Sequence, residues 1–223
     1  MNEPRRRTVA VLIFPGVELL DFAGPFEVFS SVRASEGTRE RLLDVFTVAE
    51  SMAPVACNNS LTVLPKYTLA TMPHADILVI PGGQGTRTAI DRPELIAWIA
   101  ARAAAAELTT SVCTGSFLLA KGGLLDGKAV TTHWASIERM RADFPGLEVR
   151  EATRWVDAGD VVSDHGQRHG SGDRSVVDHA DIEGGFAAVR GDLQHVVFFG
   201  RHLFRRDSVG TLPQLTHVVE DFG

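Results

Sequence analysis

Short apolar runs recur in the first two-thirds of the chain, and they stop at proline or glycine. The clearest are residues 8–14, which end at Pro15-Gly16, and residues 76–80, which end at Pro81-Gly82-Gly83. Runs without polar alternation are typical of strands that a parallel sheet buries on both faces. Further strands are predicted over residues 42–48, 108–112 and 129–132, a short hairpin or edge strand over 61–64, and a hairpin over 154–162.

Helical spacing of apolar residues fills the stretches between these strands. It predicts helices over residues 18–32, 93–106, 116–121 and 135–144. Because strands alternate with helices, we expect right-handed βαβ units and an α/β fold in which helices cover both faces of a mostly parallel central sheet. Ligands of such folds bind at the carboxyl ends of the strands.

The character of the sequence changes after Ser163. Six of the eight histidines lie in the last third, and the polar, glycine-rich residues 164–174 carry no helical periodicity. We therefore expect one domain over residues 1–163. The C-terminal segment, residues 164–223, is expected to be part of the same domain or poorly ordered.

The composition is that of an ordinary soluble globular protein, with 22% charged residues and a mean hydropathy of +0.04. A formal net charge of −6 argues against a nucleic-acid-binding surface. The basic start lacks the apolar stretch of a secretory signal, and the first apolar run is too short to span a membrane. Two cysteines make no disulfide framework, so we expect a cytosolic protein with reduced thiols; a Cys57–Cys113 bridge is the alternative.

Cys113 stands where a predicted strand passes directly into a predicted helix. In α/β proteins such a corner projects a nucleophile out of the sheet, and a helix N-terminus lowers the pKa of a thiol. Gly115 allows the backbone to turn tightly beside it. The alternative is a buried cysteine that acts as a small hydrophobic residue.

Four motifs in this order resemble the ThiJ/PfpI superfamily, and within it the isonitrile hydratases. They are residues 14–21 with Gly24-Pro25, residues 80–83, residues 111–116, and residues 123–128 followed by 131–134. The resemblance covers residues 8–162 and implies a flavodoxin-like three-layer sandwich, usually a homodimer, that acts on a small molecule. It ends after Ser163, where the family places a serine- or glycine-rich loop and a long amphipathic helix. A shifted reading frame or a divergent C-terminus would each produce this loss.

By this resemblance, Cys113 is the nucleophile and Asp21 the general acid and base of an enzyme that adds water to an isonitrile through a cysteine thioimidate. A carboxyl group near a thiol would have a raised pKa and could donate a proton. Thr114, Gly82 and Gly83 would hold a polar group of the substrate. The alternatives are local: Asp21 and Thr114 would satisfy amides at helix starts, and the glycines would form a tight turn.

Two further residues are candidates for this site. Glu18 is a second carboxylate, because glyoxalase-like and redox-sensing relatives place a glutamate near the cysteine. His133 could approach from the next strand, or it is a hydrogen-bonded buried histidine. Threonine at position 114, where superfamily peptidases carry histidine, argues against proteolysis.

Asp164, His165 and His169 have a spacing that invites a metal site, but the surrounding glycines argue against a helix that would align them. The glycines at 82–85 lack the spacing of a dinucleotide fingerprint. We therefore expect no metal and no cofactor. The rival functions are a small-molecule sensor resembling the ligand-binding half of AraC-type regulators, a glyoxalase- or deglycase-like enzyme, and a thiol redox sensor oxidised at Cys113.

Overall fold

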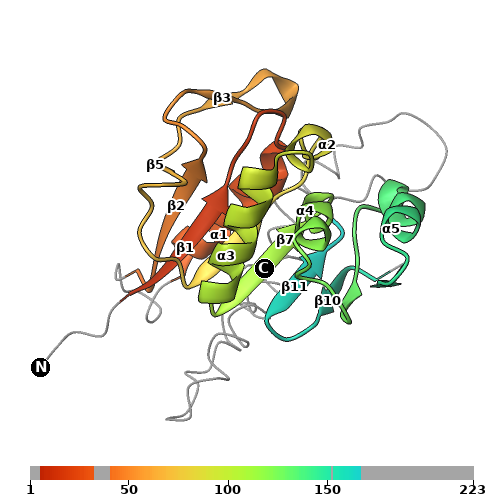
Figure 1. The fold of residues 1–223 in the computed structure, drawn as a ribbon. Coiled ribbons are helices and arrows are strands. Elements are labelled where there is room, and N and C mark those ends of the chain that lie inside the picture. The colour runs from red at the N-terminus through yellow and green to blue at the C-terminus, as the bar shows by residue number, and fades with distance from the viewer. Residues whose placement is uncertain (1–5, 33–40, 152, 167–223) are drawn as a thin grey trace, which may run out of the picture. The chain divides into compact units, whose positions relative to one another are not determined.

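The structure is a computed structural model that describes residues 6–32, 41–151 and 153–166. These described residues belong to one compact unit. The main sheet of the described part consists of β1 (Arg7–Leu12), β2 (Leu43–Ala49), β5 (Tyr67–Thr68), β6 (Ile77–Ile80), β7 (Leu108–Val112), β10 (Trp155–Asp157) and β11 (Val161–Asp164). Their spatial order is β10-β11-β7-β6-β1-β2-β5, and all neighbours are parallel except β10 and β11 (Figure 1). The mostly parallel sheet predicted from the sequence is confirmed.

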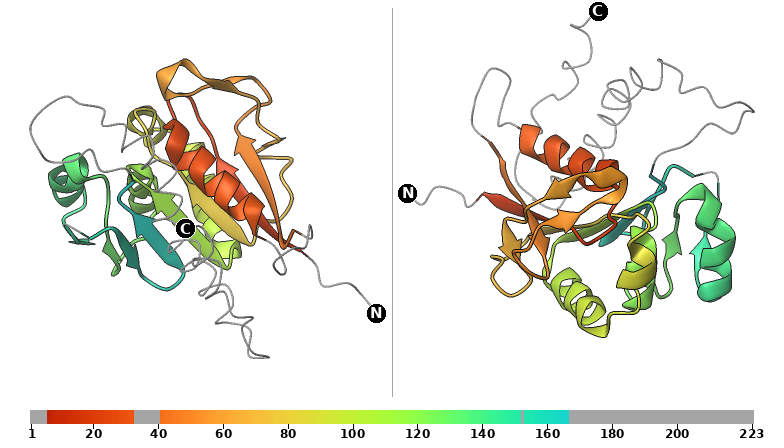
Figure 2. Two further views of the ribbon diagram at one scale, coloured as in Figure 1. Left: turned by 180° about the vertical axis from the view of Figure 1, so that it is seen from behind. Right: turned by 90° about the horizontal axis from the view of Figure 1, so that it is seen from above.

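Helices cover both faces of this sheet. They are α1 (Leu19–Ser31), α2 (Thr86–Ala89), α3 (Pro93–Ala105), α4 (Gly115–Lys121) and α5 (Ile137–Asp143), with short 3₁₀ helices η1 (Asn58–Ser60) and η2 (Trp134–Ser136). α1 lies on one face, whereas α3 and α4 lie on the other (Figure 2). The three layers agree with the flavodoxin-like sandwich that the resemblance implies.

Two small sheets stand apart from the main one. β3 (Val55–Ala56) and β4 (Thr62–Val63) form an antiparallel hairpin, and β8 (Ala129–Val130) pairs in parallel with β9 (Glu148–Val149). The strand predicted over 129–132 is therefore shorter than expected and joins β9 instead of the main sheet. The hairpin predicted over 154–162 is confirmed as β10 and β11.

The continuous apolar runs form the centre of the core. The side chains of β6 are fully buried, as are those of Val9, Ala10, Val11 and Leu12 in β1. Both strands have neighbours on each side and helices on each face, which explains why their sequences lack polar alternation.

The carboxyl ends of β1, β6, β7 and β11 lie along one edge of the sheet. The register pairs Ile80 with Ser111 and Val112 with Asp164. The turns that follow these strands therefore converge, as the sequence predicted. No helix of the described part is long and apolar enough to cross a membrane. Apart from residues 164–166, the expected C-terminal segment lies outside the described residues.

Candidate active site

Cys113 occupies a strained corner between β7 and α4. Its φ is 55°, in the left-handed region that a non-glycine residue enters only at a cost of about 1 kcal/mol or more. Hydrogen bonds hold this conformation: the Cys113 N–H donates to the carbonyl of Asp164 (2.9 Å), and the Cys113 carbonyl accepts the hydroxyls of Thr132 and Ser116 (3.1 Å each). The expected strand-to-helix corner is thus present, and hydrogen bonds to neighbouring segments hold its strained backbone in place. Cys57 and Cys113 are both free thiols, so the alternative bridge is not formed.

Asp21 meets the thiol from the first turn of α1. The Glu18 N–H donates to the carbonyl of Gly82 (2.9 Å), which ties the start of this helix to the end of β6. Asp21 is 2% exposed, and its carboxyl group interacts with the thiol of Cys113 and the backbone of Gly82. Its Oδ2 atom has no partner of ordinary hydrogen-bond geometry in the described part of the chain. This oxygen is therefore available to carry a proton into the site.

The electrostatics of the two groups are coupled. Burial raises the pKa of Asp21 from 3.8 to about 7; the hydrogen bond with Cys113 opposes this effect, and the charges of Glu18 and Asp164 add to it. Burial, followed by the charge of Asp21, also raises the pKa of the Cys113 thiol well above its usual value. The raised pKa of Asp21 was expected. The expected lowering at Cys113 is wrong, because desolvation and a like charge outweigh the donors at the start of α4, which has only seven residues.

A pH-dependent stability follows from the buried carboxyl group. Below about pH 4 it is protonated in the folded and unfolded chains alike. Between pH 4 and about 7 the unfolded chain releases this proton while the folded chain keeps it, so the free energy of unfolding falls as pH rises. In urea titrations, the Asp21→Asn variant should lose this pH dependence. As pH rises from 4 to 8, its free energy of unfolding should come to exceed that of wild type by a few kcal/mol. Parallel curves for the two proteins would contradict the burial of an ionisable Asp21.

Thr114 lies close enough to Cys113 to influence the ionisation of its thiol. Its backbone N–H and its hydroxyl each lower the pKa of Cys113, against the larger effect of burial. Thr114 begins α4 without making a side-chain cap. Its Oγ1 accepts the N–H of Gly83 at 3.0 Å, so that N–H, which the sequence suggested for a substrate, is already bound to the protein.

Gly82 is the point at which these groups pack most closely. A Cβ at this position would lie 2.6 Å from the Thr114 nitrogen and 2.9 Å from Oδ2 of Asp21. The absence of a side chain lets Asp21 and Thr114 close around the end of β6. Gly82 therefore shapes the site through its small size.

The other two predicted residues lie differently. The Glu18 carboxylate accepts the side-chain amide of Asn58 at 2.8 Å and lies close enough to raise the pKa of Asp21. His133 precedes η2, and its ring lies 5.4 Å from that of Trp134. Glu18 thus lies near the Asp21 carboxyl group, while the His133 ring packs beside Trp134.

Four residues of the site were not recognised as part of it in the sequence analysis: Thr86, Thr132, Asp164 and Gly166. Asp164 contacts the backbone of Cys113 because β11 pairs with β7, and a Cβ on Gly166 would lie 2.7 Å from Cβ of Cys113. Only the order of strands in the sheet could have revealed that these residues lie beside Cys113, because their spacing along the chain does not. Within residues 6–32, 41–151 and 153–166 no group of three or more metal-binding side chains could hold an ion, and His169 lies outside those ranges.

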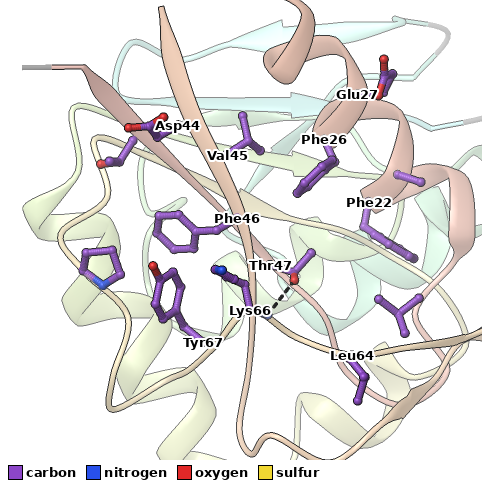
Figure 3. A pocket seen from close by; sticks show the side chains of 14 residues that line it. Phe22, Phe26, Glu27, Asp44, Val45, Phe46, Thr47, Leu64, Lys66 and Tyr67 are labelled. Carbon is purple, nitrogen blue, oxygen red and sulfur yellow. Dashed lines mark hydrogen bonds between the residues drawn. The ribbon is translucent and has the colours of Figure 1, made fainter. Parts of the chain in front are cut away.

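A separate hollow of about 750 Å³ lies between α1 and the edge formed by β2 and β5 (Figure 3). Phe22 and Phe26 of α1 face Phe46 and Tyr67 across it, and the last two rings meet edge to face at 5.1 Å. Its lining includes none of Asp21, Cys113 and Thr114. The hollow is thus distinct from the thiol corner.

Two named proteins match part of this chain in sequence. Isonitrile hydratase of Pseudomonas putida is 35% identical over 127 residues, which are 57% of this chain and 52% of that protein. The transcriptional regulator CdhR of Pseudomonas aeruginosa is 25% identical over 152 residues, 68% of this chain and 44% of the regulator. The chain thus spans about half the length of both relatives.

A solved structure and a family match complete the comparison. The crystal structure of a ThiJ/PfpI family protein from Pseudomonas syringae superposes with a TM-score of 0.64 at 31% identity, covering 73% of this chain and 63% of that one. Residues 7–169 match the DJ-1/PfpI family. The sandwich described above carries a cysteine on a strained corner beside a buried carboxyl group. The family match covers most of the chain, so the chain belongs to the DJ-1/PfpI family.

Proposed function

We propose that this protein adds water to an isonitrile and releases an N-substituted formamide. The observation that carries the proposal is the contact between the Cys113 thiol and the buried Asp21 carboxyl group, whose pKa of about 7 lets it both accept and donate a proton near neutrality. The similarity to isonitrile hydratase of Pseudomonas putida supports the choice of substrate.

In the proposed first step, the Asp21 carboxylate takes the thiol proton as the sulfur attacks the terminal carbon of the isonitrile. Asp21 then gives this proton to the same carbon, which leaves a thioimidate with a new S–C bond and a new C–H bond. The N–H and the hydroxyl of Thr114 both lower the pKa of Cys113, so they would stabilise negative charge on the sulfur as the proton leaves.

In the second step, water adds across the C=N bond, with its oxygen on carbon and one proton on nitrogen. The C–S bond then breaks and the formamide departs. The remaining hydroxyl proton returns through Asp21 to the sulfur, so the enzyme is regenerated and the atoms of one water are consumed.

The direct test is formamide production from cyclohexyl isocyanide, with Cys113→Ala as the background. We expect wild type to exceed this background clearly. Since the reactive pair needs Asp21 deprotonated before attack, kcat/KM should fall about tenfold per pH unit below about pH 7 and level off above it. Equal rates for wild type and Cys113→Ala would overturn the proposal.

A second candidate function is a small-molecule sensor, and the observation that favours it is the match to CdhR over 152 residues. A sensor would bind an isonitrile or its formamide without turnover. It would show as a raised melting temperature in the presence of either compound, with no formamide produced above background. Methylglyoxal consumption would instead favour the glyoxalase-like reading, and peroxide oxidation of Cys113 the redox sensor.

A further inference from the structure

Thr86 lies beside Gly83 and Thr114 in the site. It is the first residue of α2, it is 2% exposed, and its Oγ1 lies 2.8 Å from the Gly83 carbonyl oxygen and 3.1 Å from Oγ1 of Thr114. A buried hydroxyl with two acceptors in reach and one proton to give must choose between them. Its choice determines what the Thr114 hydroxyl can do.

The acceptor sites of this cluster can be counted. The Gly83 carbonyl has two lone pairs; Thr86 donates to it with its backbone N–H at 3.1 Å and its hydroxyl at 2.8 Å. The Thr114 hydroxyl lies farther from that oxygen, at 3.3 Å, and already accepts the Gly83 N–H at 3.0 Å. The shorter contact favours Thr86 as the hydroxyl donor to Gly83. The Thr114 proton then has two acceptors left, Oγ1 of Thr86 at 3.1 Å and the sulfur of Cys113.

We propose that Thr86 is a positioning residue for Cys113: by occupying the carbonyl of Gly83, its hydroxyl keeps the hydroxyl proton of Thr114 off that oxygen and available to the sulfur. The sulfur thereby receives two donors from Thr114, the N–H and the O–H, at the moment when its own proton moves to Asp21.

Removal of the Thr86 hydroxyl would reverse this arrangement. One lone pair of the Gly83 carbonyl would be left empty in a buried position, which is unfavourable. Thr114 already lies 3.3 Å away and would turn its proton to that oxygen. The thiolate would lose one donor, so Cys113 would ionise less readily at any given pH.

The test is the rate at which iodoacetamide alkylates Cys113, followed across pH by mass spectrometry of the Cys113 peptide, which separates it from Cys57. Below the thiol pKa, Thr86→Val should slow alkylation by about tenfold to 100-fold, the range expected for losing a hydrogen bond to a charged group. Thr86→Ser should restore the wild-type rate. Thr88→Val is the matched control, because Thr88 lies on the same helix and its hydroxyl donates to the Gly85 carbonyl instead.

A purely structural role for Thr86 would give a different result. If Thr86 acts through Thr114, the double variant Thr86→Val/Thr114→Val should be no slower than Thr114→Val alone. A wild-type rate in Thr86→Val, or independent losses in the double variant, would overturn the inference. If Thr86→Val does not fold, as judged by its melting curve, Thr86→Ala carries the same test.

This inference rests on the proposed function for its catalytic meaning, but alkylation needs no isonitrile. If the Thr86 variants behave as expected and no formamide forms, the proposed function fails while the positioning role stands. If formamide forms at equal rates in wild type and Thr86→Val, and alkylation is also unchanged, the positioning role fails alone.

Discussion

Asp21→Asn is expected to slow formamide production by about 10²- to 10⁴-fold, the usual contribution of a general acid and base. The amide cannot take the thiol proton or return it to carbon. At the same time, alkylation of Cys113 by iodoacetamide at pH 7 should become faster, because the charge of Asp21 raises the pKa of the thiol and the amide removes that charge. One substitution should therefore move the two reactions in opposite directions.

This pair of measurements separates proton transfer from simple damage. A variant that distorts the corner would slow both reactions. Asp143→Asn is the control, since Asp143 ends α5 and pairs with Arg139 on the surface; it should change neither rate. Unchanged hydration in Asp21→Asn would exclude Asp21 as the proton carrier.

Gly82→Ala is expected to lower kcat/KM for the isonitrile by about 100-fold or more, as displacements near 1 Å at a reacting centre do. The new methyl group would lie 2.6 Å from the backbone nitrogen of Thr114, 2.8 Å from its Oγ1 and 2.9 Å from Oδ2 of Asp21. The first of these is backbone and cannot swing aside, so the proton carrier and the start of α4 must separate. The measurement is the isonitrile assay beside a melting curve.

Gly146→Ala is the matched control for this variant. No atom lies within 4 Å of a Cβ at that position. It should keep wild-type activity and melting temperature. Near-normal hydration by a folded Gly82→Ala protein would mean that the close packing of Asp21 and Thr114 around the end of β6 is not required.

The longer elements were predictable because each repeats its pattern. β1 and β6 carry uninterrupted apolar runs, and α1 and α3 carry several turns of helical spacing; the structure places them within about two residues of the expected bounds. β3, β5 and β9 have two residues each, which is too short for any period to appear. Such elements exist because of the neighbours they pair with.

The site was predictable as far as chain order determines it. A cysteine at the end of β7 and a carboxyl group in the helix after β1 lie at the same edge if both strands belong to one parallel sheet, so they can come together there. The pKa of Cys113 was not predictable from the sequence, because it depends on burial and on the charge of Asp21, which are properties of packing. Thr86 was missed for the same reason: its relation to Thr114 crosses 28 positions of sequence. The homodimer and the cytosolic location stay predictions.

The upward shift in the pKa of Cys113 has a consequence for selectivity. A sulfur that keeps its hydrogen at rest is a poor target for stray oxidants and alkylating agents, because only the ionised form attacks them readily. It becomes nucleophilic when a partner base draws that hydrogen away in concert with bond formation. Under the proposed function, chemistry at this corner would favour compounds that accept both the sulfur and the hydrogen at a single atom, as the terminal carbon of an isonitrile does.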